Sequence, residues 1–117
     1  MGLGIYYKDM CVWQSSYSIF GEFREMLILV SGRDVSEIDY DEYKLQGMWI
    51  ECPEEPLDIL FAHSDCDGFI MPWLGAKLAD RLEKLLTDIS DDWHEATWGL
   101  INGLKQASED FALLEFA

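Results

Sequence analysis

The stretch from residue 57 to residue 89, LDILFAHSDCDGFIMPWLGAKLADRLEKLLTDI, decides the fold because it carries the clearest helical pattern in the chain. After Pro72, leucines at positions 74, 78, 82 and 85 recur at helical spacing, so they line one face of a helix. Proline suits the first turn of a helix, where its missing N–H leaves no bond unmade. Before the loop, Pro56 and the run LDILF predict a short helix, with a strand as the alternative. The stretch therefore predicts a helix–loop–helix over about 57–89.

The loop between these helices, HSDCDGFI at 63–70, resembles the middle of an EF-hand calcium loop. When Gly68 is aligned with the glycine of that loop, Asp65 and Asp67 take two ligand positions. Phe69 then offers its carbonyl oxygen, whereas Leu74 stands where the closing glutamate belongs. Calcium prefers six or more oxygen ligands, so we expect binding through residues 65–69 to be weak.

His63 occupies the first position of the loop, where an acid is usual. Zinc held by His63, Cys66 and an aspartate is a further alternative, but their spacing is not that of a common zinc motif. We favour a structural interpretation, in which an aspartate accepts backbone N–H bonds and Gly68 adopts a positive φ. We therefore expect no cofactor, with calcium as the alternative.

Strand-like patterns lie towards both ends of the chain and in its middle. The runs LGIYY at 3–7 and CVW at 11–13 fit a hairpin. The run GMWIEC predicts a strand near 47–51, and FALLEF at 111–116 predicts a strand at the C-terminal end. These strands are enough for a small antiparallel sheet.

Two further helices are predicted by apolar spacing, one over about 18–31 and one from Trp93 to about 108. Ser16 or Ser18 can cap the first of them. Gly99 and Gly103 weaken the second helix intrinsically, which indicates that another element approaches it closely. We therefore expect one α+β domain over 1–117, with three to four helices packed on the sheet.

The charge of the chain restricts its partners. The net charge is −15, from 23 acids against 8 bases, and residues 31–60 alone carry nine acids and two bases. Acids repel phosphates, so nucleic acid and anionic membranes are poor partners, and basic proteins are natural ones. A merely solvated acidic surface is the simpler alternative.

The N-terminal region and the cysteines predict a cytoplasmic location. No basic and apolar leader is visible, and the longest aliphatic run, MLILV at 26–30, is far too short to span a membrane. Three cysteines without a Cys-x-x-Cys pair do not predict a disulfide framework, which fits a reducing compartment. We expect a cytoplasmic, unanchored protein.

These observations predict an acidic, non-enzymatic protein-binding module. An inhibitor, an immunity-type protein or a phage counter-defence protein of this kind would block a basic surface by presenting carboxylates where phosphates would lie. Aromatic side chains are common binding anchors, so two tryptophans and the acids of the middle segment are the expected contact residues. They are Trp49, Trp73, Asp39, Asp41, Glu42, Glu54 and Glu55.

Two alternatives remain beside this function. One is a calcium-binding module using Asp65, Asp67 and Phe69. The other is a small enzyme, in which Cys66 would pair with His63 or His94, or two acids would share a cleft. No phosphate loop or dinucleotide-binding pattern is present to support an enzyme.

The motif HSDCDG at 63–68, followed by Pro72 and a helix of the form LA-RL, resembles a group of small uncharacterised bacterial and prophage proteins. The upstream run SYSIFGEFR resembles the aromatic first helix of the same group. The resemblance implies a cytoplasmic protein of one domain, and it carries over no catalytic role to particular residues. It makes His63, Asp65, Asp67 and Gly68 the natural residues to test.

Overall fold

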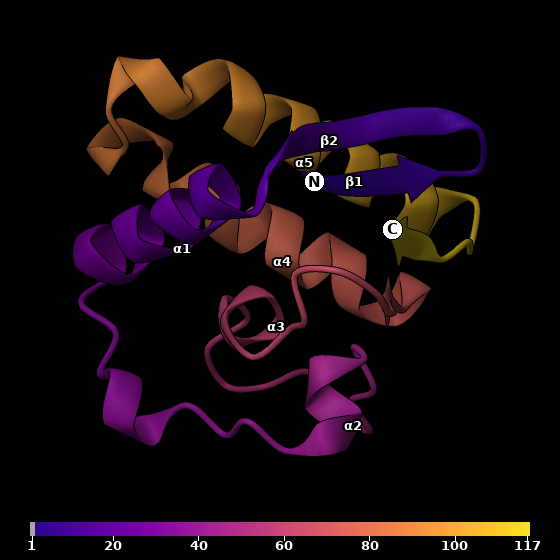
Figure 1. Cartoon of the computed structure of the whole chain (residues 1–117), viewed down its shortest axis with the longest axis horizontal. Coiled ribbons are helices and arrows are strands. Elements are labelled where there is room, and N and C mark those ends of the chain that lie inside the picture. Colours follow the sequence, from indigo (N-terminus) through magenta and orange to yellow (C-terminus); the bar gives the residue numbers. More distant parts are fainter. Residues whose placement is uncertain (1) are drawn as a thin grey trace.

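The two ends of the chain meet in one antiparallel sheet, as Figure 1 shows for the computed structural model, which describes residues 2–117. Strands β1 (Gly2–Tyr7) and β2 (Met10–Ser16) form a hairpin, and β4 (Leu114–Phe116) pairs with the other side of β1. Strand β3 (Phe69–Ile70) pairs with β4, so the strand order is β2-β1-β4-β3. The predicted N-terminal hairpin and C-terminal strand are confirmed.

Helix α1 (Tyr17–Ser31) follows β2 directly and confirms the helix predicted over about 18–31. The Ser16 hydroxyl accepts a hydrogen bond from the backbone N–H of Ile19 at 3.2 Å, which satisfies an otherwise unpaired donor. Gly32 ends the helix with a φ of 70°, a conformation that glycine adopts without strain. The buried face consists of Phe20, Phe23 and Leu27.

Helices α4 (Pro72–Leu85) and α5 (His94–Glu109) follow the loop, as the spacing of their apolar residues predicts. Two short 3-10 turns, Leu86–Asp88 and Asp91–Trp93, connect them. The leucines at 74, 78, 82 and 85 are all buried, so they form the predicted apolar face. Within residues 2–117, no helix combines the length and the apolar character that crossing a membrane requires.

The glycines of α5 mark its approach to the sheet. A β-carbon on Gly103 would lie 2.4 Å from a methyl carbon of Val12 in β2, and one on Gly99 would lie 3.5 Å from the Val12 carbonyl oxygen. A larger residue at position 103 would therefore push α5 away from β2. The expected close approach of another element is confirmed.

The helices and the sheet share a hydrophobic core. One cluster of buried side chains includes members of β1, β4, α1, α4 and α5, together with the short helix α3 (Asp58–Phe61). Burying an apolar side chain of this size contributes about 1.5–3 kcal/mol, so the shared core dominates the stability of the fold. The fold class is α+β, as predicted.

The strand predicted near 47–51 is wrong. Helix α2 (Glu42–Leu45) ends just before it, and the N–H of Met48 bonds to the carbonyl of Tyr43, which turns the chain back over α2. Gly47 has a φ of 85°, which no strand allows. The fourth strand of the sheet is instead β3, which lies inside the predicted loop.

The predicted helix–loop–helix over 57–89 is present, although its first helix, α3, has only four residues. Gly68 adopts a φ of 95°, as expected for a turn. The loop also contains β3, whose pairing with β4 ties it to the sheet. The likeness to an EF-hand is not confirmed and stays a prediction.

The segment between α1 and α3 consists mostly of irregular chain. In Figure 1 it is the magenta chain along the lower side, containing the 3-10 turn Val35–Glu37 and α2. Four side chains fasten its two ends, and we call them the arginine clasp: Arg33 with Asp58, and Arg81 with Glu55. The clasp holds the segment in place although the segment contributes few side chains to the core.

Candidate functional site

The candidate site lies on the middle of this segment, where α2 ends and the chain becomes extended. Asp41 caps α2, because its Oδ1 accepts a hydrogen bond from the N–H of Lys44 at 3.0 Å. Gly47 follows α2, and a β-carbon there would lie only 1.6 Å from the carbonyl oxygen of Phe69. Only glycine therefore allows the chain to pass this point so close to β3.

The residues that follow are related to β3 and to α4. The N–H of Phe69 bonds to the carbonyl of Gln46 at 3.0 Å. Burial raises the pKa of the Cys52 thiol, and nearby Lys77 of α4 opposes that change. Glu55 then pairs with Arg81, one turn further along α4. Gln46 thus lies at β3, and Glu55 lies at α4.

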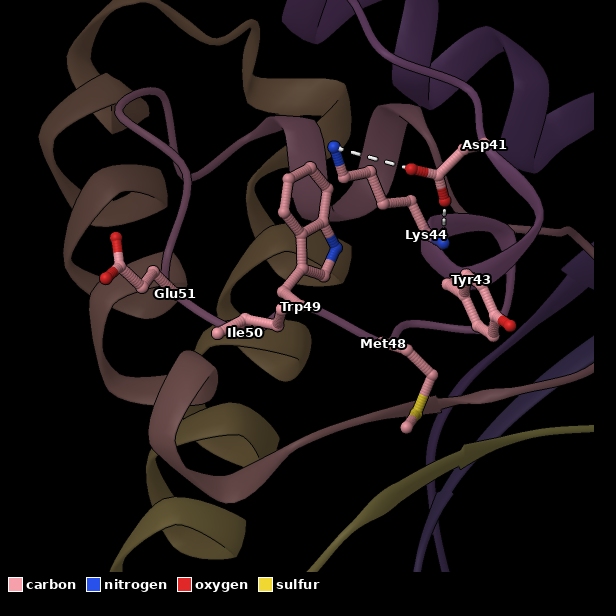
Figure 2. A pocket seen from close by; sticks show the side chains of 7 residues that line it. All are labelled: Asp41, Tyr43, Lys44, Met48, Trp49, Ile50 and Glu51. Carbon is pink, nitrogen blue, oxygen red and sulfur yellow. Dashed lines mark hydrogen bonds and ion pairs between the residues drawn. The ribbon is translucent and has the colours of Figure 1, made fainter.

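We call the exposed surface formed here the 39–51 patch. It surrounds a hollow of about 750 Å³, which Figure 2 shows from close by. Ile50 is fully exposed, Tyr43 is 74% exposed and Met48 is 48% exposed, so the patch presents apolar side chains to solvent. The patch consists of Asp39, Tyr40, Asp41, Tyr43, Lys44, Met48, Trp49, Ile50 and Glu51.

Lys44 is the base at the centre of the 39–51 patch. Its Nζ lies 2.5 Å from Oδ2 of Asp39, 3.6 Å from Oδ2 of Asp41 and 4.7 Å from the ring centroid of Trp49. The hydrogen bond to Asp39 raises the pKa of Lys44, so the ammonium stays charged. In Figure 2 the lysine chain lies between the indole of Trp49 and Asp41, and a dashed line joins its Nζ to the Asp41 carboxylate.

Trp49 is half-buried, and its indole N–H is enclosed with no hydrogen-bond partner among residues 2–117. An unpaired buried donor costs stability. The indole is therefore held in place by packing and by its contact with the Lys44 ammonium, not by a hydrogen bond of its own. Trp73, the other predicted aromatic, lies in the first turn of α4 and is 51% exposed. Trp49 lines the hollow of the patch, whereas Trp73 is not among the residues that line it.

The predicted acids divide into two groups. Asp39 and Asp41 belong to the patch, and Glu42 is exposed beside them in the first turn of α2. Glu55 belongs to the arginine clasp, where its two carboxylate oxygens accept hydrogen bonds from Nε and Nη2 of Arg81. Glu54 lines the same hollow as the clasp.

Sequence reasoning missed the exposed apolar residues Tyr43, Met48 and Ile50 and the central position of Lys44. Met48 and Ile50 were assigned to a strand, whose alternate side chains would have been buried. The available signal was Gly47, because a turn there exposes the residues that follow it. A lone lysine among acids was the second signal.

His63 of the HSDCDG motif is a core residue, 2% exposed. Its Nδ1 lies 2.7 Å from the carbonyl oxygen of Ser64, and its Nε2 lies 2.9 Å from that of Phe69. The ring stacks on Phe116 of β4, with centroids 3.9 Å apart. Burial lowers the pKa of His63, and it outweighs the two carbonyl oxygens, which favour the charged ring.

Two of the three residues proposed for calcium, Asp67 and Phe69, have partners within the protein. Asp67 accepts a hydrogen bond from the Gln46 amide at 3.2 Å, and the carbonyl of Phe69 faces His63. Among residues 2–117, no group of three or more His, Cys, Asp or Glu side chains is arranged to hold a metal ion. An ion here would have to displace Gln46 and His63, and the calcium alternative stays a prediction.

A second hollow, of about 610 Å³, lies between α1 and the loop and is lined by Arg24, Tyr40, His63 and Asp65 among others. Arg24 donates from Nη1 to the carbonyls of Leu60 and His63, at 3.2 and 2.8 Å, so it braces the loop. The sulfur of Cys66 lies 3.3 Å from the hydroxyl of Ser64. With both nitrogens of His63 directed at carbonyls, this hollow carries no argument for catalysis, and the enzyme alternative stays a prediction.

Comparison of the chain with protein-family models, with curated proteins and with solved structures finds no match. The resemblance to small bacterial and prophage proteins therefore stays a prediction. The function must be argued from the 39–51 patch and from the charge around it.

Proposed function

We propose that this protein is an acidic protein-binding module that docks a basic partner on the 39–51 patch. The observation that carries the proposal is the exposure of Tyr43, Met48 and Ile50 around one hollow. Large apolar side chains gathered on a surface mark interaction sites, and aromatic residues are enriched among binding anchors.

The charge around the patch favours a basic partner. Residues 34–55 contain eight acids and one base, Lys44, which is already paired with Asp39 and Asp41. Such a field speeds the approach of a cationic surface and repels nucleic acid. The apolar residues then supply the contact area that charge alone does not provide.

An inhibitor with this arrangement of carboxylates and apolar side chains would block a basic surface of its partner. A partner whose basic surface normally holds phosphates would meet carboxylates there, while Ile50 and Met48 fill an apolar depression beside them. This action fits an inhibitor, an immunity-type protein or a phage counter-defence protein working in the cytoplasm. The calcium-binding function has no comparable observation in its favour.

The proposal is tested by mapping the contact of a short synthetic peptide of lysine and leucine residues, which we call the KL peptide. In 15N–1H NMR titrations, we expect shift changes to concentrate in residues 39–51, and to weaken as salt is added. Oligolysine of the same charge is the control, and it should bind more weakly because it lacks apolar contacts. Shift changes spread evenly over all acidic surfaces, or equal binding of both peptides, would contradict the proposal.

A further inference from the structure

We infer that Asp39, Asp41 and the indole face of Trp49 form a recognition site for one lysine or arginine side chain of the partner, and that Lys44 fills this site in the free protein. The inference rests on the proposed function and names the chemical group that the patch selects. Lys44 is then an internal substitute for the partner's cation.

The geometry is that of a cation site. The Lys44 ammonium touches Asp39 at 2.5 Å, faces Asp41 at 3.6 Å and lies 4.7 Å from the centroid of the Trp49 ring. Two carboxylates supply negative charge, and the face of an indole attracts a cation more strongly than other aromatic rings do. Nζ of Lys44 already occupies the position that the charged nitrogen of a partner's side chain would take.

The site is also open to a partner. It borders the hollow of about 750 Å³, and Asp41, Lys44 and Trp49 all line that hollow. The side chains of Asp39 and Asp41 are 62% and 47% exposed, so an incoming cation can reach both carboxylates. An alkylammonium or guanidinium group of a docked partner would thus meet them beside the apolar side chains of the patch.

Lys44 can leave without breaking the fold. Its contacts are ion pairs with exposed acids, and pairs of this kind are weak because water competes for both charges. The cap of α2 is independent of the lysine head group, since Asp41 bonds the backbone N–H of Lys44 through its other oxygen. Binding therefore replaces the Lys44 ammonium with a cation of the partner, and the released lysine side chain regains conformational freedom in solvent.

The test removes the internal cation. Lys44→Met removes the ammonium that lies over the indole while keeping most of the aliphatic chain, and we expect it to bind the KL peptide about three- to tenfold more tightly than the natural protein. Lys105→Met is the matched control, because Lys105 also pairs with an acid, Glu83, and its loss changes the net charge equally. Equal affinities of the two variants would overturn the inference. Lys44→Gln provides the same test if Lys44→Met does not fold.

A second readout identifies the group that binds. In the Lys44→Met protein, Nα-acetyl-lysine methylamide should shift the indole N–H signal of Trp49, whereas the norleucine analogue should not. Adding Asp39→Asn or Asp41→Asn should reduce that shift, and asparagine at 41 can still cap α2. Equal shifts from both amides, or no response to either asparagine, would overturn the inference.

The two proposals can fail separately. If the KL peptide binds the patch but Lys44→Met and Lys105→Met behave alike, the cation site is wrong and the docking surface stands. If the KL peptide binds elsewhere or not at all in every variant, the docking function is wrong. If only the lysine amide shifts Trp49 while the peptide binds elsewhere, the cation site stands alone.

Discussion

The arginine clasp and the 39–51 patch lie on the same acidic segment, yet they use carboxylates in opposite ways. In the clasp, Asp58 is 6% exposed and accepts hydrogen bonds from Nε and Nη2 of Arg33 at 2.9 and 2.7 Å. In the patch, Asp39 is mostly exposed and faces a single flexible lysine. Buried acids paired with arginine hold the segment in place, whereas the exposed acids paired with Lys44 remain accessible to a partner. A count of acids cannot separate these roles, but the burial of each carboxylate can.

The largest effect on stability should come from the clasp. Arg33→Met leaves Asp58 buried without its partner, and we expect the free energy of unfolding to fall by about 2–3 kcal/mol. Lys44→Met, which likewise removes the base of an acid–base pair but in the exposed patch, should cost less than about 0.5 kcal/mol. Urea denaturation followed by tryptophan fluorescence measures both. Similar losses in the two variants would mean that the clasp and the patch do not differ as described.

The next effect is a dependence of stability on pH, which we expect to arise from His63 in the core and not from either acidic region. Because burial lowers the pKa of His63, the unfolded chain binds a proton at this residue more readily than the folded protein does. The stability that neutral His63 contributes is complete above about pH 6.5 and is lost as the pH falls through the lowered pKa. In that range the free energy of unfolding falls by up to about 1.4 kcal/mol per pH unit. In urea titrations between about pH 6.5 and 5, His63→Gln should flatten this dependence. If His63→Gln keeps the slope of unfolding free energy against pH that the natural protein has, the pH dependence arises from another residue.

Local patterns predicted most of the fold. The leucine spacing after Pro72 and the aromatic spacing before Gly32 identified α4 and α1, because one buried face requires that spacing. The glycines of α5 predicted the close approach of another element, which the structure identifies as β2. The two-residue strand β3 had no signal of its own, since it is defined by pairing with β4 far along the chain.

The candidate site was only partly predictable. Trp49, Asp39 and Asp41 were named from the sequence, but Glu55 could not be assigned to the clasp without knowing that Arg81 lies opposite it. The position of Lys44 over Trp49 likewise depends on the turn at Gly47, which folds the chain back on α2. Contacts between distant residues decide which acids are exposed, and those contacts are a property of the fold.

The smallest effect on stability should accompany the largest effect on binding, and it tests the docking surface most directly. Ile50→Asp and Leu29→Asp each add one acid at an exposed apolar residue, but only Ile50 belongs to the patch, whereas Leu29 lies on α1. In calorimetric titrations with the KL peptide, Ile50→Asp should weaken binding about tenfold, and Leu29→Asp should leave it nearly unchanged. Equal affinities of the two variants would contradict the assignment of the 39–51 patch as the docking surface.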